Sequence, residues 1–139
     1  GRLLAELDEQ RIDNVKVLEG DALALLHEQL PNASLVGIRL FFPDPWPKKK
    51  HHKRRLVIES NLDAMARVLS SGGFLHFATD WADYAEWALE AITRHPDFHL
   101  LKPDEEPDIA SARTRPRTKF ESRGLAAGRG ITDLVARRR

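Results

Sequence analysis

The sequence predicts an α/β protein, a doubly wound sandwich built around a largely parallel sheet. Segments with the pattern of strands alternate with segments with the pattern of helices along the chain. Leu35–Phe42 is almost entirely apolar, as expected for a central parallel strand that is buried on both faces. With 139 residues, of which 42% are hydrophobic and 31% charged, the chain has the composition of one ordered globular domain.

Three elements are expected before this strand. Leucines at helical spacing within the first seven residues indicate that the chain begins inside a helix. Asn14–Glu19 has the pattern of a short strand, which Gly20-Asp21 closes. Ala22–Leu30 then carries a helical stripe of apolar residues that ends at Pro31.

The alternation continues after the central strand. The expected elements are a helix over Arg55–Leu69, a strand over Phe74–Thr79, a helix after Asp80 with the apolar stripe Tyr84–Ile92, and short strands over Phe98–Leu101 and Ile131–Ala136. The segment 102–130 is rich in proline, arginine and glycine. It is too long for a simple connection in a compact domain, so we expect it to carry part of the function.

The most informative stretch is Phe41-Phe42-Pro43-Asp44-Pro45-Trp46-Pro47, which is followed at once by the basic run Lys48–Arg55. Prolines on both sides of Asp44 restrict the backbone and remove amide donors, which disfavours an ordinary helix cap and leaves a turn as the alternative role. In open α/β sheets, chemistry is found where the carboxyl ends of strands meet the loops. A lone carboxylate, an indole and a cluster of cations at such an end indicate a site for a flat, polyanionic substrate.

Charge and composition exclude several classes of protein. The formal net charge is only +1, but positive charge concentrates in 48–55, in 113–123 and in 137–139, which favours a polyanion as partner. The absence of cysteine excludes disulfides and thiol sites. We find no apolar run of membrane-spanning length and no signal peptide, and therefore expect a cytoplasmic protein.

Other candidate residues allow two interpretations each. Asp21 and Asp80 both follow predicted strands, where a carboxylate either caps the next helix or binds a ligand. His51 and His52 have no partner at metal-ligand spacing, so we expect a solvated basic face and no metal site. We expect His76 to be a structural neighbour of the site. Of the tryptophans, Trp46 is the candidate for stacking on a base, whereas Trp81 and Trp87 are expected to pack against the sheet.

Three motifs together give a resemblance to a known family. The run Phe41–Arg55, the tetrapeptide Ala78-Thr79-Asp80-Trp81 and the segment Arg117-Thr118-Lys119-Phe120-Glu121-Ser122-Arg123-Gly124 follow one another in the order seen in TrmB-type tRNA (guanine-N7)-methyltransferases. Gly20-Asp21-Ala22 is similar to the third-strand acid of methyltransferases that use S-adenosylmethionine. The resemblance extends from one end of the chain to the other.

The resemblance implies a Rossmann-like class I methyltransferase sheet, mostly parallel with an antiparallel last strand. Residues 1–139 would form the C-terminal two-thirds of a single domain, with a substrate-binding loop at about 102–130. The family resembles other class I methyltransferases in holding its cofactor through a glycine-rich loop after strand 1 and an acid that ends strand 2. Neither motif is present, so we expect the first two strands to be missing from this chain, and this chain alone to be inactive.

The resemblance also implies an activity, namely transfer of a methyl group from S-adenosylmethionine to N7 of guanine 46 in the variable loop of tRNA. Asp44 would be catalytic and, with Asp21, would border the cofactor. The substrate guanine would be held by Lys48, Asp80, Thr118, Lys119, Phe120 and Glu121. The tRNA backbone would be bound by Lys50, His51, His52, Lys53, Arg54 and Arg55. The expected partner is tRNA, without membrane or metal, and the expected state is a monomer or a weak homodimer.

Two other functions remain open from the sequence. Pro43-Asp44-Pro45-Trp46 also resembles the Asp-Pro-Pro-Tyr type of loop in enzymes that methylate exocyclic amines of adenine or cytosine. A non-catalytic tRNA-binding subunit or fragment would account for the missing glycine loop. It would not account for the presence of Asp44, Asp80 and the segment 118–121.

Overall fold

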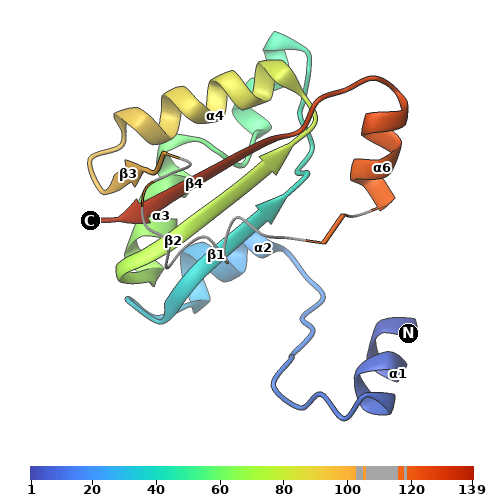
Figure 1. Cartoon of the computed structure of the whole chain (residues 1–139). Coiled ribbons are helices and arrows are strands. Elements are labelled where there is room, and N and C mark those ends of the chain that lie inside the picture. Colours follow the sequence, from blue (N-terminus) through green and yellow to red (C-terminus); the bar gives the residue numbers. More distant parts are fainter. Residues whose placement is uncertain (103–104, 106–115, 118) are drawn as a thin grey trace.

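The computed structural model describes residues 1–102, 105, 116–117 and 119–139 (Figure 1). Its sheet has four strands in the order β1-β2-β4-β3. β1 (Leu35–Phe41) pairs in parallel with β2 (Leu69–Thr79), while β4 (Thr132–Arg138) is antiparallel to β2 and to β3 (Phe98–Leu100). Because β4 runs against both of its neighbours, β1, β2 and β3 share one direction. The predicted mostly parallel sheet with an antiparallel last strand is confirmed.

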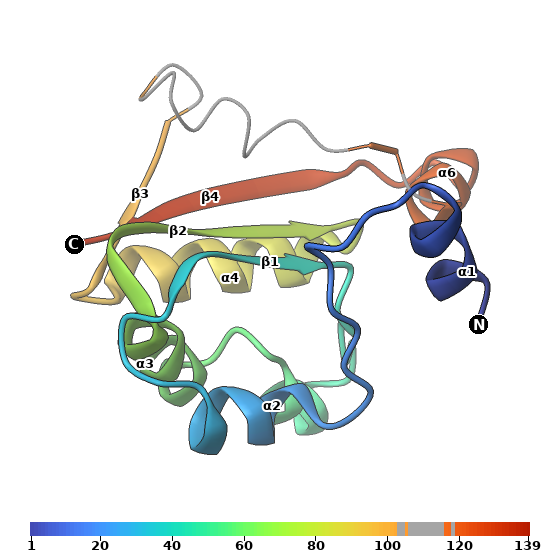
Figure 2. The ribbon, with the colours of Figure 1, turned by 90° about the horizontal axis from the view of Figure 1, so that it is seen from below.

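Helices pack against one face of this sheet, as Figure 2 shows for α2, α3 and α4. α2 (Ala22–Ala24) continues into the π-helical segment η1 (Leu25–Gln29). α3 (Glu59–Val68) leads directly into β2, and α4 (Ala82–Arg94) follows it. The apolar faces of these helices and the alternate residues Leu75 and Phe77 of β2 form one continuous core. Tyr84 of α4 packs edge-on to Phe77, with 5.1 Å between the ring centroids.

The first twenty residues do not join this core. α1 (Arg2–Glu9) has no buried residue. The strand predicted over Asn14–Glu19 is wrong: the segment forms no strand, and Val15, Val17 and Leu18 are 47%, 51% and 73% exposed. A segment with the residue pattern of a strand forms one only when a neighbouring strand supplies the hydrogen bonds of the sheet. Among the described residues, no strand lies beside this segment.

Several predicted boundaries differ from the observed ones. The helix expected over Arg55–Leu69 begins only at Glu59, and the strand expected over Phe74–Thr79 begins at Leu69. The pairing of β2 with β1 is irregular near its start, because the register shifts between Leu35 and Gly37 of β1. A Cβ atom on Gly37 would lie 2.4 Å from the ring of Phe74, so any larger residue would require this ring to move.

Two helices were missed by the sequence reasoning. The basic run contains the 3₁₀-helix η2 (Lys49–Arg54), and α6 (Lys119–Ala126) lies inside the segment 102–130 that was expected to be a loop. Both stand next to the carboxyl ends of β1 and β2. In the part of the chain that the structure describes, no helix is both long and apolar enough to span a membrane.

Candidate functional site

The carboxyl ends of β1 and β2 define the candidate site. Phe41 pairs with Ala78 in the parallel register, so the two strands end side by side. The amide of Phe42 donates to the carbonyl of Ala78 over 2.8 Å, which ties the start of the loop after β1 to β2. α6 lies beyond these strand ends in both views (Figures 1 and 2). The predicted motifs around Asp44, Asp80 and 119–121 therefore gather at one edge of the sheet.

The loop after β1 has an unusual backbone. Phe42 and Trp46 adopt the left-handed conformation, with φ of 51° and 45°. For residues other than glycine, this conformation costs about 1–3 kcal/mol and persists only where surrounding contacts hold it. Asp44 lies between the two residues and is exposed. Its carboxylate makes no hydrogen bond or ion pair with any residue that the structure describes.

Exposed cations follow this loop. The exposed basic side chains are those of Lys48, Lys49, Lys50, Lys53 and Arg54. The guanidinium of Arg54 lies over the ring of Trp46 at 5.0 Å, and His51 meets the same ring edge-on at 5.8 Å. η2 therefore presents a basic face that packs against Trp46, two residues after Asp44. One arginine already lies over the indole that we expected to stack on a base.

Arg55 and His52 do not fit the roles that the sequence suggested. Arg55 is only 1% exposed, and its guanidinium bonds to Asp83 and to the carbonyl of Pro45. A buried guanidinium with protein partners is not available to tRNA phosphates, so we withdraw Arg55 from the predicted contacts. The side chain of His52 is 18% exposed, lies 3.8 Å from Asp83 and packs edge-on to Trp87, rather than on a solvated face.

Asp80 is not the cap of the following helix, which was one of its two interpretations. The capping position of α4 belongs to Trp81, whose amide donates to the hydroxyl of Thr79 over 3.2 Å. The carboxylate of Asp80 instead accepts a hydrogen bond of 2.7 Å from Nε of Arg129. Forty-nine positions separate these two residues in the sequence, and no local pattern revealed the pair.

α6 packs directly against Asp80. A Cβ atom on Gly124 would lie 2.9 Å from Oδ2 of Asp80, so the absence of a side chain at 124 permits this approach. Lys119 and Glu121 belong to the first turn of this helix. Thr118 lies outside the described residues, and for Phe120 only the backbone position in α6 is described. Next to Asp80, an open hollow of about 510 Å³ is bordered by Trp81 and by the turn Gly128-Arg129-Gly130.

Asp21 has the capping role that was one of its two interpretations. Its Oδ1 accepts the amide of Leu23 over 2.9 Å at the start of α2. The side chain is exposed, and within the described residues its other carboxylate oxygen has no hydrogen-bond partner. One oxygen thus remains for a ligand N–H group. In residues 1–102, 105, 116–117 and 119–139, no group of three or more histidine, aspartate or glutamate residues is arranged to hold a metal ion.

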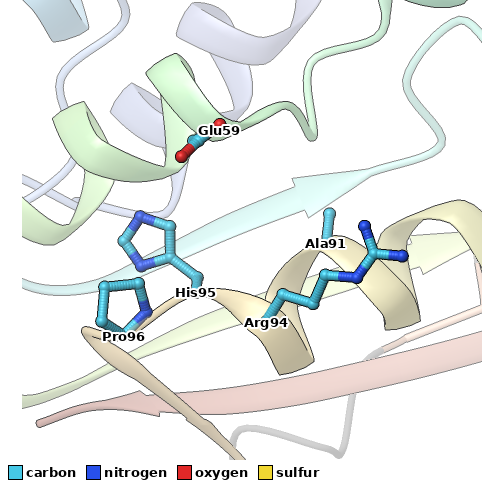
Figure 3. A pocket seen from close by; sticks show the side chains of 5 residues that line it. All are labelled: Glu59, Ala91, Arg94, His95 and Pro96. Carbon is cyan, nitrogen blue, oxygen red and sulfur yellow. The ribbon is translucent and has the colours of Figure 1, made fainter.

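The remaining aromatic candidates are structural. His76 is fully buried on β2, where its Nε2 lies 2.7 Å from Oδ1 of Asp133 and its ring packs edge-on to Phe41 at 4.9 Å. Trp81 and Trp87 pack against the core, as expected. Another hollow, of about 210 Å³, lies between α3 and the end of α4 and contains Glu59, Arg94 and His95 (Figure 3). It contains none of the predicted site residues.

Comparison with known proteins shows the family to which the chain belongs. A family model described as "putative methyltransferase" matches residues 1–134. Relatives named tRNA (guanine-N(7)-)-methyltransferase are 45% identical in Nitrosococcus oceani and 49% identical in Alkalilimnicola ehrlichii. The matches cover 99% and 100% of this chain, and 56% and 58% of the relatives. The chain therefore spans little more than half the length of these curated relatives.

Solved structures support the fold. A SAM-dependent O-methyltransferase from Thermotoga maritima aligns with 96% of this chain and 43% of its own, at a TM-score of 0.52 and 15% identity. The cyclase SpnF aligns with 96% of this chain and 61% of its own, at a TM-score of 0.55 and 16% identity. At such low identity the likeness concerns the fold alone, and it agrees with the predicted Rossmann-like sheet.

Proposed function

The chain belongs to the putative methyltransferase family, and on that premise we propose that the protein transfers a methyl group from S-adenosylmethionine to N7 of a guanine in tRNA. The observation that carries the proposal is the edge formed by β1 and β2. There an exposed carboxylate, a basic 3₁₀-helix and the Asp80–α6 contact lie together. The names of the relatives support both tRNA as the substrate and N7 of guanine as the methylated atom, in agreement with the sequence motifs.

Asp44 is the residue to which we assign the chemistry. Guanine N7 carries an exposed lone pair, so its methylation requires no proton removal, and the protein has mainly to position two reactants. The purine becomes cationic as the methyl group arrives, and a carboxylate near the ring lowers the free energy of that charge. Asp44 suits this role because its position is fixed by a constrained backbone while its carboxylate stays exposed.

Asp80 and the first turn of α6 are assigned to the guanine itself. Guanine presents N1–H and N2–H as adjacent donors, which one ionised carboxylate can accept together. A carboxylate has about four acceptor positions, so Asp80 can keep its bond to Arg129 and still accept a base. Lys48 and the segment 118–121 complete the proposed guanine contacts, as the family resemblance implies.

S-adenosylmethionine, when bound, supplies a methyl group activated on a sulfonium. Asp21 fits its adenosine end, because the free oxygen of the exposed carboxylate can accept an exocyclic N–H group. Asp44 fits the cationic end by charge. We assign these two residues to the cofactor.

The exposed cations of η2 are assigned to tRNA phosphates. Phosphate contacts fix the position of a nucleic acid without reading its sequence. Lys50, Lys53 and Arg54 are exposed on η2, and His51 on the same short helix packs, like Arg54, against the ring of Trp46. They would hold the tRNA backbone while Asp44 and Asp80 face the base.

The test is identification of the methylated nucleoside. The protein as it occurs in the cell is incubated with tRNA and isotopically labelled S-adenosylmethionine, and the digested tRNA is examined by mass spectrometry. We expect labelled 7-methylguanosine, and we expect replacement of guanine 46 in the variable loop to abolish it. Label in N6-methyladenosine or N4-methylcytidine would instead support an exocyclic-amine enzyme. tRNA binding without transfer would support a non-catalytic subunit.

A further inference from the structure

Arg55 belongs to a run of basic residues in the sequence, but in the structure its side chain is buried and bonded to other residues of the protein. We propose that Arg55 is a positioning residue, which fixes the Asp44 loop by clamping the carbonyl of Pro45 onto helix α4. Its importance for methyl transfer rests on the function proposed above, whereas its effect on the conformation of the loop does not. Arg55 is thereby set apart from its neighbours Lys53 and Arg54, which are exposed.

The contacts of Arg55 fill a built site. Nε donates to the carbonyl oxygen of Pro45 over 2.9 Å, and Nη2 donates to the carboxylate of Asp83. The guanidinium lies 4.9 Å from the ring of Tyr84 and 5.1 Å from that of Trp87. Arginine suits such a site because its planar group donates in fixed directions and stacks on aromatic rings. One buried side chain thus joins the loop after β1 to three residues of α4.

The loop requires such a clamp. Trp46, directly after Pro45, has a φ of 45°, and Phe42 at the other end of the Asp44 turn has a φ of 51°. Each costs about 1–3 kcal/mol and must be held by neighbouring contacts. Phe42 is held by its amide bond to Ala78. The bond from Arg55 to Pro45 is the corresponding restraint at the second end.

The chain on the other side of Arg55 is anchored to the same helix. The hydroxyl of Tyr84 accepts the amides of Leu56 and Val57 over 3.1 and 3.2 Å. The indole of Trp87 donates to the carbonyl of Val57 over 2.7 Å. Residues 55–57 therefore have a fixed position on α4, and Arg55 transmits that position back to the turn that contains Asp44.

Substitution of Arg55 by lysine distinguishes a positioning role from phosphate binding, because lysine keeps the positive charge but lacks the planar guanidinium. In the complete natural protein, we expect Arg55→Lys to lower the single-turnover methylation rate, measured with enzyme in excess, by about tenfold or more, because a misplacement of about 1 Å can cost a hundredfold. We expect tRNA affinity to keep the wild-type dependence on salt. Arg54→Ala, which removes an exposed neighbouring cation, should instead lower the slope of log affinity against log salt by about 0.7–0.9.

Hydrogen exchange gives a readout that does not depend on activity. We expect Arg55→Lys to speed exchange of the hydrogen-bonded amides in and beside the Asp44 loop, those of Phe42, His51 and Leu56, while amides in β2 and α4 stay protected. Asp83→Asn, at an exposed position that does not endanger the core, should produce the same pattern to a smaller extent. If the wild-type protein transfers no methyl group, the proposed function fails and this measurement still decides the role of Arg55.

Arg67 provides a matched control. It also donates to backbone carbonyls, those of Leu26 and Leu30 over 2.7 and 2.9 Å, but it lies near the start of β1 and not its end. Arg67→Lys should leave both the rate and the exchange of the Asp44 loop unchanged. A wild-type rate for Arg55→Lys, a salt slope lowered as in Arg54→Ala, or unchanged exchange in the Asp44 loop would each overturn the proposal.

Discussion

The neighbouring strands β1 and β2 are each followed by an aspartate, Asp44 and Asp80. The protein restrains these two aspartates in different ways. After β1, contacts to Phe42 and Pro45 restrain the backbone, and the carboxylate of Asp44 points to solvent without a partner among the described residues. After β2, the carboxylate of Asp80 itself is restrained, by Arg129 and by the close approach of Gly124.

The contrast follows from what each carboxylate is proposed to do. A group that stabilises developing charge must keep its charge uncompensated until the substrate arrives, so its position has to come from the backbone. A group that orients a base needs a fixed direction of its lone pairs, which a neighbouring arginine can supply. The strain at Phe42 and Trp46 is therefore found beside Asp44 and not beside Asp80.

The largest effect is expected when the exposed carboxylate is neutralised. Asp44→Asn should lower the single-turnover rate by about thirtyfold, equivalent to at least about 2 kcal/mol of lost transition-state stabilisation. Because asparagine keeps the shape of the loop, tRNA affinity should change little. Rates for both proteins at saturating tRNA and cofactor test this. A near wild-type rate would remove Asp44 from the mechanism and make its exposure a simple property of the turn.

The next effect concerns the basic face beside Asp44. The combined change of Lys50, Lys53 and Arg54 to alanine should weaken tRNA binding by about tenfold and lower the salt slope by roughly 2, since each phosphate contact contributes about 0.7–0.9. Affinity measured from low to moderate salt tests this expectation. Arg94→Ala, which removes a 73% exposed cation at the far end of α4, is the control and should not change the slope. An intact slope in the triple variant would make η2 a solvated surface.

These two predictions draw on the part of the site that the sequence could reveal. The signal around Asp44 is contiguous: an apolar strand, prolines on both sides of one acid, and a run of cations. Such local patterns also identified the parallel strand β1 and gave the helix cap as one of two roles for Asp21. The contacts that distinguish Arg55 from Arg54, in contrast, join it to positions 28 and 29 residues away, because Asp83 and Tyr84 on α4 complete the site. Charge alone cannot show which arginine of a run is buried.

The errors at the N-terminal end and at Asp80 have the same origin. Asn14–Glu19 has the residues of a strand, but strand formation depends on a neighbour that the pattern does not contain. Asp80 has the local features of a helix cap, yet Arg129 is a better partner and comes from a turn next to β4. In both cases a tertiary contact, or the lack of one, decided the outcome, and the local sequence pattern did not contain that information.

A smaller effect is expected at the packing between Asp80 and α6. Gly124→Ala places a methyl group 2.9 Å from Oδ2 of Asp80, so the carboxylate or the helix has to shift, and the hydrogen bond to Arg129 is disturbed. We expect kcat/KM to fall about fivefold, equivalent to about 1 kcal/mol, while stability stays equal or rises because alanine favours helix more than glycine. Gly130→Ala is the control, since no atom lies within 4 Å of its added Cβ. Equal activity of both variants would show that the orientation of Asp80 is not important.

The smallest effect tests the ion pair that supports the Asp44 loop. The hydrogen bond from Arg55 lowers the pKa of Asp83 from its ordinary value of 3.8; burial opposes this shift, and the positive charges of Arg55, His52 and Lys49 reinforce it. A carboxyl group with a lowered folded-state pKa stabilises the protein above pH 3.8, and this contribution is lost as the pH falls through the folded-state value. Asp83→Asn should therefore cost about 0.5–1 kcal/mol at neutral pH, because the carboxylate of this pair is exposed and its charge is screened by solvent.

The difference between the two proteins should then shrink towards acid pH. Denaturant unfolding of wild type and Asp83→Asn, from neutral pH to below pH 3.8, measures it directly. A difference that is the same at every pH would mean that Asp83 does not hold Arg55 through its charge. The clamp on Pro45 would then depend on the rings of Tyr84 and Trp87, and Trp87→Leu, rather than Asp83→Asn, would be the substitution that frees the Asp44 loop.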